Sequence, residues 1–490
     1  MGGQLAPGAL PRAGAEPLRR LGRAGAAGAR PGRRHEGRRA AGDGDAEGRV
    51  RPAPERGVRL RRRRARVRGR RRRQRPQHAR EAGRRARQRG GRGRRSGGRR
   101  ARAARGAGAM MAILLLALQQ TLEGPLGVPA APASRGDAIR GAVEWLVAHQ
   151  NKDGSWGSHH SPRPIEVLAD VPGSHQAFRV ATSALCVMAL AAGPQPTDAS
   201  RAAHSRGLDY LLADYDVKRP SGMEHYNVWS FGYTLQCFGE HLLAQPADPR
   251  AEALRAASRR LVEKLALYQA LDGGWGYLSL DEVPTFRPSF TSMSFTTATC
   301  LIGLQRARQA GIEVPQAVVD KAVASIVRCQ TPTGSFTYGE LWRNSPGRGI
   351  NQLKGAACRA PACLEAIGVF GREPSAEQCA SALDDLLVRN ARFQVASLRR
   401  PIPHESHYQI SGYFYLYGHY YATLLLARVP DPARYAPLLE QAVMICREPD
   451  GSFWDYPLYS YHKPYGTAFA LLVLAQLGSR IPDVASAAGS

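Results

Sequence analysis

The chain has 490 residues, with 69 Lys plus Arg against 40 Asp plus Glu and a net charge of +29. A charge of that size usually indicates a partner such as nucleic acid or an anionic surface. However, residues 1–109 hold 36 Arg, no Lys and 7 acidic residues, whereas residues 110–490 hold 33 basic and 33 acidic residues. The larger part of the chain is therefore neutral, which argues against nucleic-acid binding anywhere except in residues 1–109.

The first 109 residues are mostly Arg, Gly, Ala and Pro, and they contain no Phe, Tyr or Trp. Ordering a backbone costs about 1–2 kcal/mol per residue, and this segment has too few apolar side chains to offset that cost. We therefore expect residues 1–109 to be disordered.

Three interpretations of this segment compete. A nucleic-acid-binding tail would be expected to include some Lys and some aromatic residues for base stacking. An organelle transit segment should be amphipathic and rich in serine, but Ser96 is the only serine before position 110. We favour the third interpretation, in which the segment translates GC-rich sequence upstream of a true start at Met110 or Met111.

Residues 110–133 have the features of a signal peptide. An apolar run, Ala112–Leu118, is followed by small residues suited to cleavage after Ala130 or Ala133. The run is far shorter than the ~20 apolar residues that a membrane-spanning helix needs, and we predict no membrane span. The pattern predicts export to the periplasm or the extracellular space; the alternative is the first turn of a buried helix.

Beyond position 137 the chain repeats a turn in which an Asp-Gly or Thr-Gly pair is followed closely by an aromatic residue. Clear copies occupy 150–156, 269–275, 330–336 and 447–453, and their first residues are separated by 119, 61 and 117 positions. These separations indicate a unit of about 60 residues. Weaker copies near 206–212 and 383–388 complete six units.

Each unit has the same internal plan. An amphipathic helix ends at the turn, where the Gly supplies a left-handed conformation, and a more apolar helix follows. A polar-faced helix paired with a nearly all-apolar one predicts an outer and an inner ring. We therefore predict an all-α (α/α)6 toroid over residues 137–478, followed by a flexible tail at 479–490, with inner helices at 176–192, 226–244, 292–310, 352–369, 408–428 and 465–477.

The turn and the Arg-Gly-x-x-x-Trp-Leu helix that precedes it, beginning at Arg140, resemble the repeats of the prenyltransferase and squalene (terpenoid) cyclase family. The six-hairpin count is similar to the α/α toroid of protein prenyltransferase β subunits. The resemblance covers about 137–478 and implies the fold. It says less about activity, because these repeats fasten the scaffold together and take no part in the chemistry.

The catalytic motifs that the resemblance would imply are missing. The cyclase acid, Asp-x-Asp-Asp, does not occur; the nearest acidic pairs are Asp384-Asp385, expected on a solvated outer face, and Asp281-Glu282, in a loop. The transferase zinc ligands would fall in the stretches 417–420 and 465–467, but the required Asp, Cys and His are replaced there. We accordingly expect no cofactor and assign no metal site.

Polar and aromatic residues nevertheless gather at the predicted cavity positions. His404, His407, Asp455 and His462 could act as acid and base or gather a divalent cation. The simpler alternative is that such residues hydrogen-bond helix ends. Tyrosine-dense inner helices favour an amphipathic, isoprenoid-like or sugar-like ligand. Candidate ligand-binding residues are His225, Trp229, Arg287, Tyr413, Tyr417, His419 and Tyr461.

Three functions remain open from the sequence. The first is an exported toroid protein, without the family's catalytic motifs, that binds a ligand or partner at its central cavity. The second is a terpenoid cyclase-like or transferase-like enzyme, or one acting on glycans, with a divergent acid and base. The third is a scaffold whose cavity is filled by its own tyrosines.

The proposed start site gives a first prediction. Intact mass and N-terminal peptides of the native protein should show no sequence before Met110, and the exported form should begin just after Ala130 or Ala133. Recovery of Arg-rich peptides from residues 40–100 would contradict the proposed start.

Overall fold

The computed structural model describes residues 133–160, 172–217, 226–277, 291–402 and 409–480. These all lie in the second of two compact units, Arg92–Ser490. The predictions made for residues 1–109, for the signal peptide and for most of the tail fall outside the described residues. Across the described ranges the secondary structure is helical, with isolated bridges and no strand, which confirms the predicted all-α class.

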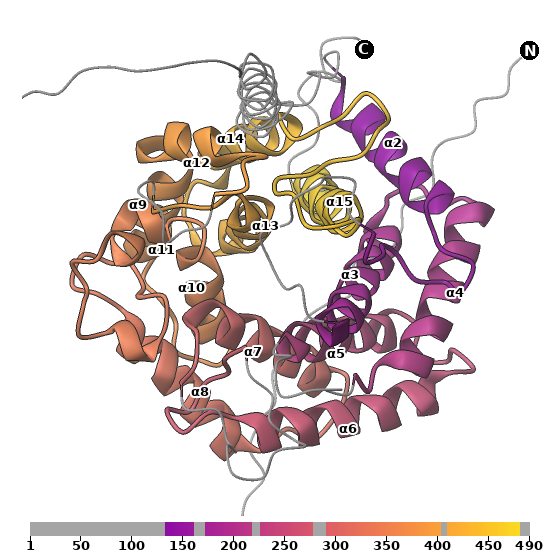
Figure 1. Ribbon diagram of the computed structural model, residues 1–490, viewed down its shortest axis with the longest axis horizontal. Coiled ribbons are helices and arrows are strands. Elements are labelled where there is room, and N and C mark those ends of the chain that lie inside the picture. The colour runs from indigo at the N-terminus through magenta and orange to yellow at the C-terminus, as the bar shows by residue number, and fades with distance from the viewer. Residues whose placement is uncertain (1–132, 161–171, 218–225, 278–290, 403–408, 481–490) are drawn as a thin grey trace, which may run out of the picture. The chain divides into compact units, whose positions relative to one another are not determined.

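Six inner helices in the described part of the chain form a closed ring (Figure 1). Each contacts the next, and the last contacts the first. Their sides face neighbouring inner helices, the outer layer or the centre of the ring, which explains why α5 buries all but a few of its residues. They are α3 (Pro172–Ala192), α5 (Asn227–Ala244), α7 (Ser294–Gln309), α10 (Ala360–Gly368), α13 (Tyr415–Leu425) and α15 (His462–Arg480).

Outside this ring lies a layer of amphipathic helices, one before each inner helix (Figure 1). In α8, for example, Val319, Val323 and Ile326 are buried while the opposite face is exposed. The outer helices are α2 (Arg135–Ala148), α4 (Asp198–Asp214), α6 (Ala251–Tyr268), α8 (Gln316–Cys329), α11 (Ala376–Asp384) and α14 (Pro432–Met444).

The fourth and fifth hairpins depart from the simple plan. The fourth inner helix is broken: α9 (Leu353–Ala356) ends early, and α10 begins near Pro361, a residue suited to a first helical turn. After α11 the chain forms a π-helical turn, Asp385–Arg389, and then α12 (Ala391–Ser397). Short 3-10 turns are η2 (Glu340–Trp342), η3 (Gly349–Asn351), η5 (Gly412–Phe414) and η6 (Leu426–Arg428).

The π-helical turn corrects one expectation. Asp385 was predicted on a solvated face, but it is buried, and its carboxylate pairs with Arg389 at 2.6 Å. Asp384 accepts from Arg434 at 2.7 Å. Asp384 therefore holds the fifth hairpin against α14, whereas Asp385 stabilises the π-helical turn itself.

A glutamine at the start of the turn ties successive hairpins together. Gln150 Nε2 donates to the carbonyls of Gly154, in its own turn, and Ala203, in α4, at 2.9 and 2.8 Å. Gln269 repeats both bonds, to Gly273 and to Val318 of α8, at 2.7 Å each. One side-chain amide thus closes a turn and fixes the next outer helix.

The aromatic residue of the turn joins the two helices of a hairpin. Trp156 donates its indole N–H to the Leu146 carbonyl at 2.8 Å and its backbone N–H to the Ser183 hydroxyl at 3.0 Å. Its ring packs against Gly207 of α4, where a Cβ would lie 2.9 Å from the ring. The indole is therefore wedged between neighbouring hairpins and needs a glycine opposite it.

The outer layer closes between its last and first elements. Gly451, with φ +86°, lies so near α2 that a Cβ there would sit 2.8 Å from the Gly141 carbonyl oxygen. Arg135 at the start of α2 pairs with Glu440 of α14 at 2.6 Å. Glycine is required at position 451 by both the positive φ and this close approach.

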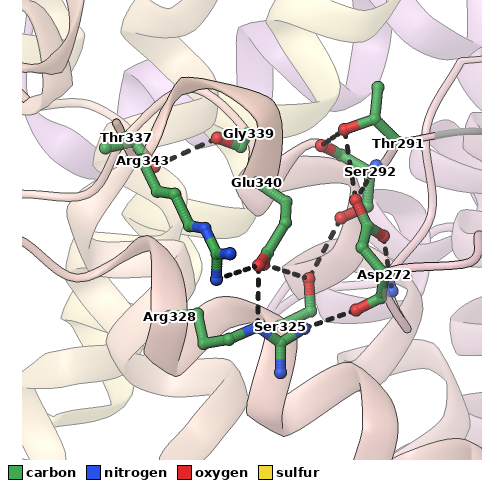
Figure 2. Close-up of polar contacts among 10 residues, drawn as sticks. Asp272, Thr291, Ser292, Ser325, Arg328, Thr337, Gly339, Glu340 and Arg343 are labelled. Atoms are coloured by element: carbon green, nitrogen blue, oxygen red, sulfur yellow. Dashed lines mark hydrogen bonds and ion pairs between the residues drawn. The ribbon is translucent and has the colours of Figure 1, made fainter. Parts of the chain in front are cut away.

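A polar clasp joins the third and fourth hairpins, and Figure 2 shows it in close-up. The Asp272 carboxylate accepts from the backbone N–H of Ser292 at 2.7 Å. Arg328 donates to Glu340 at 2.7 Å and to the Asp272 carbonyl at 2.5 Å. Arg343 also pairs with Glu340, at 3.1 Å. The carboxylates of Asp272 and Glu340 therefore hold the turn that contains Asp272 in place.

The turn tryptophans yield a stability prediction. Trp275 is buried and repeats the Trp156 bonds, donating to the Leu265 carbonyl at 2.7 Å. Trp275→Ala should lower the free energy of unfolding by about 3–5 kcal/mol, because it removes a large buried side chain and the indole hydrogen bond to the Leu265 carbonyl. Urea unfolding measures this.

The matched control is Leu271→Ala in the same turn, where the side chain is 71% exposed. It should change the free energy of unfolding by less than about 0.5 kcal/mol. Equal effects of the two substitutions would contradict the role assigned to the tryptophan.

Candidate ligand-binding cavity

A cavity of about 270 Å³ lies inside the ring of inner helices. Five of the six inner helices contribute to its wall, Tyr338 comes from the segment before the fourth, and most of the lining residues are aromatic. Three residues predicted from the sequence, Trp229, Tyr413 and Tyr417, are part of this lining; whether they bind a ligand stays a prediction. The remaining residues that line the cavity are Phe178, Ala181, Thr182, Leu185, Tyr226, Tyr233, Tyr277, Phe295, Tyr338, Phe414, Leu458, Tyr465 and Phe469.

Phe295 of α7 holds much of the aromatic wall together. Its ring makes edge contacts with Tyr338 and Phe414 at centroid distances of 5.1 and 4.9 Å. Trp229 of α5 lies 5.8 Å from the same ring and 6.1 Å from Tyr417. Such edge-to-face pairs fix ring orientations, so the wall is preformed.

The polar atoms of the wall are mainly tyrosine hydroxyl groups. Tyr277 and Tyr338 share a hydrogen bond of 2.7 Å, and Tyr417 donates to the Phe295 carbonyl at 3.0 Å. Burial raises the pKa values of Tyr277 and Tyr417 far above their usual range, so both stay neutral. The wall can thus offer a ligand a few neutral hydrogen-bonding groups on an apolar surface.

A buried cation lies behind one part of this wall. The Arg359 guanidinium lies 5.3 Å from the ring centres of both Tyr338 and Phe414. It donates to the carbonyls of Gly355 and Ile350 at 2.7 and 2.6 Å, while its Nε has no hydrogen-bond partner among the described residues. Desolvation lowers the pKa of Arg359. The two rings separate its charge from the cavity.

A buried carboxyl group, Asp455, lies behind another part of the wall. Its Oδ2 accepts from the backbone N–H of Leu416 at 2.9 Å, and its Oδ1 accepts from the Tyr465 hydroxyl at 2.7 Å. Burial raises the pKa of Asp455 to about 6, against these hydrogen bonds, which lower it. Tyr465 is itself one of the residues that line the cavity.

Strained backbone surrounds Asp455. Arg399, with φ 62°, donates its backbone N–H to the Asp455 carbonyl at 2.6 Å, and Tyr459 has φ 46°. Positive φ at residues other than glycine is costly and often marks a functional site. Nothing in the sequence pattern indicated either conformation.

Two predicted cavity residues lie elsewhere. His419 is in a second cavity of about 260 Å³, between α13 and the outer layer, with Nδ1 2.7 Å from the Tyr415 carbonyl. Burial lowers the pKa of His419 to about 4. Tyr461 does not belong to the lining; it is buried where the sixth hairpin meets the first, and its hydroxyl donates to the His175 carbonyl at 3.1 Å.

The predicted acid–base group is described only in part. His462 Nδ1 lies 2.5 Å from the Tyr459 carbonyl oxygen, and its ring lies against Trp454. Asp455 has Tyr465 as its side-chain partner. No group of three or more His, Cys, Asp or Glu residues suited to a metal occurs within the described ranges. The remaining predicted site residues, His404, His407, His225 and Arg287, lie outside the described residues.

Sequence reasoning missed much of the wall. The spacings of three and four between Tyr226, Trp229 and Tyr233 place these residues on one face of α5. Because Trp229 was predicted, this spacing could also have identified Tyr226 and Tyr233. Tyr277 and Tyr338 follow turn aromatics by two residues, a shared offset that could also have been noticed.

Residues 134–349 match the family model of the squalene-hopene cyclase C-terminal domain. The resemblance to the terpenoid cyclase repeat family is confirmed. Drimenyl diphosphate synthase of Streptantibioticus cattleyicolor is 29% identical over 213 residues, 42% of this chain and 33% of that protein. The chain thus spans about a third of the length of this curated relative.

Solved structures with similar folds belong to proteins of different chemistry. The type II terpene cyclase MstE from Scytonema has a TM-score of 0.43 and 15% identity, over 71% of this chain and 99% of that chain. An inactive variant of an α-1,6-mannanase of Salegentibacter sp. HEL1_6, in complex with α-1,6-mannotriose, has a TM-score of 0.43 and 11% identity, over 70% and 99%. These likenesses are distant, and neither bears on what this terpenoid cyclase-like chain binds.

Two further findings concern the whole described part of this terpenoid cyclase-like chain. No described helix is both long enough and apolar enough to cross a membrane. All eight cysteines are buried and carry free thiols.

The buried carboxyl gives a pH-dependent stability prediction. Asp455 has an ordinary pKa of 3.8 and a folded-state pKa of about 6, so the folded protein binds its proton more tightly than the unfolded chain does. Its contribution to stability therefore falls as pH rises. Between pH 4.5 and 7.5, Asp455→Asn should gain about 2 kcal/mol relative to wild type, measured by urea unfolding.

Asp450→Asn is the control for this measurement. Burial acts to raise the pKa of Asp450, but hydrogen bonds from Lys463 and Ser452 bring this pKa down to about 2. Its protonation therefore lies below the tested range, and the difference from wild type should be the same at both pH values. A pH-independent difference for Asp455→Asn as well would show that Asp455 is not the titrating group.

Proposed function

We propose that this protein binds a small isoprenoid-like ligand in its central cavity. The observation that carries the proposal is the preformed aromatic wall, with Trp229, Phe295 and Tyr417 at its core. Such a wall removes apolar surface from water, worth about 25 cal/mol per Å². The name of the matched relative, drimenyl diphosphate synthase, adds support, because it denotes chemistry on an isoprenoid.

The size of the cavity favours a short chain over a large polycyclic ligand. Its volume of about 270 Å³ is near the lower end of the ~300–1,000 Å³ that small-molecule sites occupy. A cavity of this volume also argues against a scaffold plugged by its own side chains. A ligand of two or three isoprene units is the proposed class.

The polarity of the wall argues against a glycan. A sugar carries hydroxyl groups on every side, and each one buried without a partner costs free energy. The wall offers a few tyrosine hydroxyls, of which Tyr277, Tyr338 and Tyr417 already share hydrogen bonds within the protein. An apolar chain makes far fewer such demands.

The sequence provides no Asp-x-Asp-Asp acid of the cyclase type, so binding without cyclisation is the first form of the proposal. The Arg359 cation behind Tyr338 and Phe414 supports this choice. A positive charge there disfavours the developing cation of a cyclisation reaction, since like charges repel in a poorly solvated interior. Enzymatic turnover with a divergent acid is the alternative.

Export is part of the same proposal. It rests on the apolar run Ala112–Leu118 and the small residues at Ala130 and Ala133. An exported ligand-binding toroid would meet isoprenoids outside the cytoplasm.

Binding of farnesol, measured by calorimetry, tests the proposal. Trp229→Ala should weaken farnesol binding by about 10- to 100-fold, because it removes a large aromatic surface from the wall. Mass spectrometry of small molecules retained by the natively purified protein should identify an isoprenoid.

Phe393→Ala is the matched control, because this aromatic residue is 37% exposed on α12, away from the lining. It should bind farnesol as wild type does. If wild type binds no farnesol and retains no apolar small molecule, the proposed function is wrong.

A further inference from the structure

We infer that the cavity between α13 and the outer layer is a second binding site, which takes a small aromatic molecule with one N–H or O–H donor, such as an indole. The cavity has a volume of about 260 Å³ and lies between the π-helical turn 385–389, α12, α13 and α14 (Figure 1). It shares no lining residue with the central cavity. This second site is therefore independent of the proposed function.

His419 provides the hydrogen-bond acceptor of the second site. The residue is only 2% exposed, and it is part of the cavity wall. Its Nδ1 lies 2.7 Å from the Tyr415 carbonyl oxygen, and because a carbonyl can only accept, Nδ1 carries the proton. Burial lowers the pKa of His419 to about 4, so the imidazole is neutral at pH 7. Nε2 therefore holds a lone pair that can accept a hydrogen bond.

The Nε2 atom of His419 is available to a ligand. The imidazole ring makes one hydrogen bond, through Nδ1, and lies against the Tyr415 ring with the ring centres 4.3 Å apart. Nε2 has no partner among the described residues, yet it is not one of the fully enclosed side-chain atoms without a partner, so it keeps some accessible surface. Because His419 belongs to the wall, that surface faces the cavity.

The repeat itself indicates an aromatic occupant. In the first hairpin the buried Trp156 fills the space between α2, α3 and α4. The aromatic residues of the other clear turns are buried as well: Trp275, Phe336 and Phe453. In the fifth hairpin, residues 385–397 after α11 hold a single aromatic residue, Phe393, which is 37% exposed. The cavity lies between the corresponding elements, which are the π-helical turn that follows α11, α13 and α14.

The size and the wall of the cavity suit a small aromatic ring. Apolar cavities of about 150 Å³ hold benzene. A cavity of about 260 Å³ therefore accommodates a bicyclic ring. Leu386 and Leu387 are buried and give the wall apolar surface. Val395 and Ile445 also line the cavity but are 43% and 44% exposed, so they give an apolar molecule a path from solvent.

The test compares indole with indene, which has the same bicyclic shape but no N–H group. The wild type should bind indole about tenfold more tightly than indene, the value of one hydrogen bond to a buried acceptor. Calorimetry gives both dissociation constants. In nitrogen NMR spectra, the signal of one histidine Nε2 should move upfield when indole is added and stay in place when indene is added.

Two variants make the test specific. His419→Phe keeps a ring but has no acceptor, so its preference for indole should fall to about twofold or less. The nitrogen signal that indole moves should be missing from this variant. Ala442→Phe places a ring in the cavity and should abolish the binding of both compounds. Circular dichroism verifies the fold of each, and either variant alone is sufficient if the other is unstable.

Tyr420→Phe is the matched control. Tyr420 follows His419 on α13, but it lines neither cavity, and its hydroxyl accepts from Gln236 at 2.9 Å. This variant should bind indole and indene as the wild type does.

Competition with farnesol locates the bound indole. Indole should bind with the same affinity when farnesol is in excess, because the two cavities share no lining residue. Displacement of indole by farnesol would place indole in the central cavity, which overturns the second site and leaves the proposed function intact. Binding of indole without any binding of farnesol would contradict the proposed function and leave the second site intact.

Three results would overturn the second site directly. They are a wild type that does not bind indole, a wild type that binds indole and indene equally, and a His419→Phe variant that keeps the preference for indole.

Discussion

The arrangement of this molecule depends on one side-chain amide that makes two hydrogen bonds. Gln150 and Gln269 each donate to a carbonyl in their own turn and to one in the next outer helix. The second bond anchors each of these turns to the next hairpin, in addition to the packing of the turn tryptophans. The inner helices form a closed ring, and aromatic residues far apart in sequence meet at its centre.

The cavity wall separates charges from the ligand space. Asp455 lies behind the hydroxyl of Tyr465, and Arg359 lies behind the rings of Tyr338 and Phe414. Each charge costs free energy of desolvation, which the closed ring tolerates because so much apolar surface is buried around it. The residues that line the cavity itself are all uncharged. The wall thus offers polarity without exposing an ion.

The fold could be predicted from the sequence because its signals are local: the turn glycines and their aromatic residues recur at a fixed interval. The π-helical turn at 385–389 has no such signal, and it displaced Asp385 from the surface. The site was predicted only in part, because a lining depends on which helix face meets the centre. Tyr417 and His419 are two positions apart and so point to nearly opposite faces, which is why only Tyr417 lines the central cavity.

Ring closure has a consequence for how the chain is made. The cysteine thiol of Cys186 in α3 donates to the Pro464 carbonyl in α15 at 3.6 Å, across 278 positions of sequence. Until α15 has been synthesised, α3 and α13 lack the helix between them, and their apolar surfaces stay uncovered. Contacts of such long range form slowly and leave intermediates prone to aggregation. Synthesis of α15 therefore sets the point at which the ring can close and the nascent chain becomes less prone to aggregate.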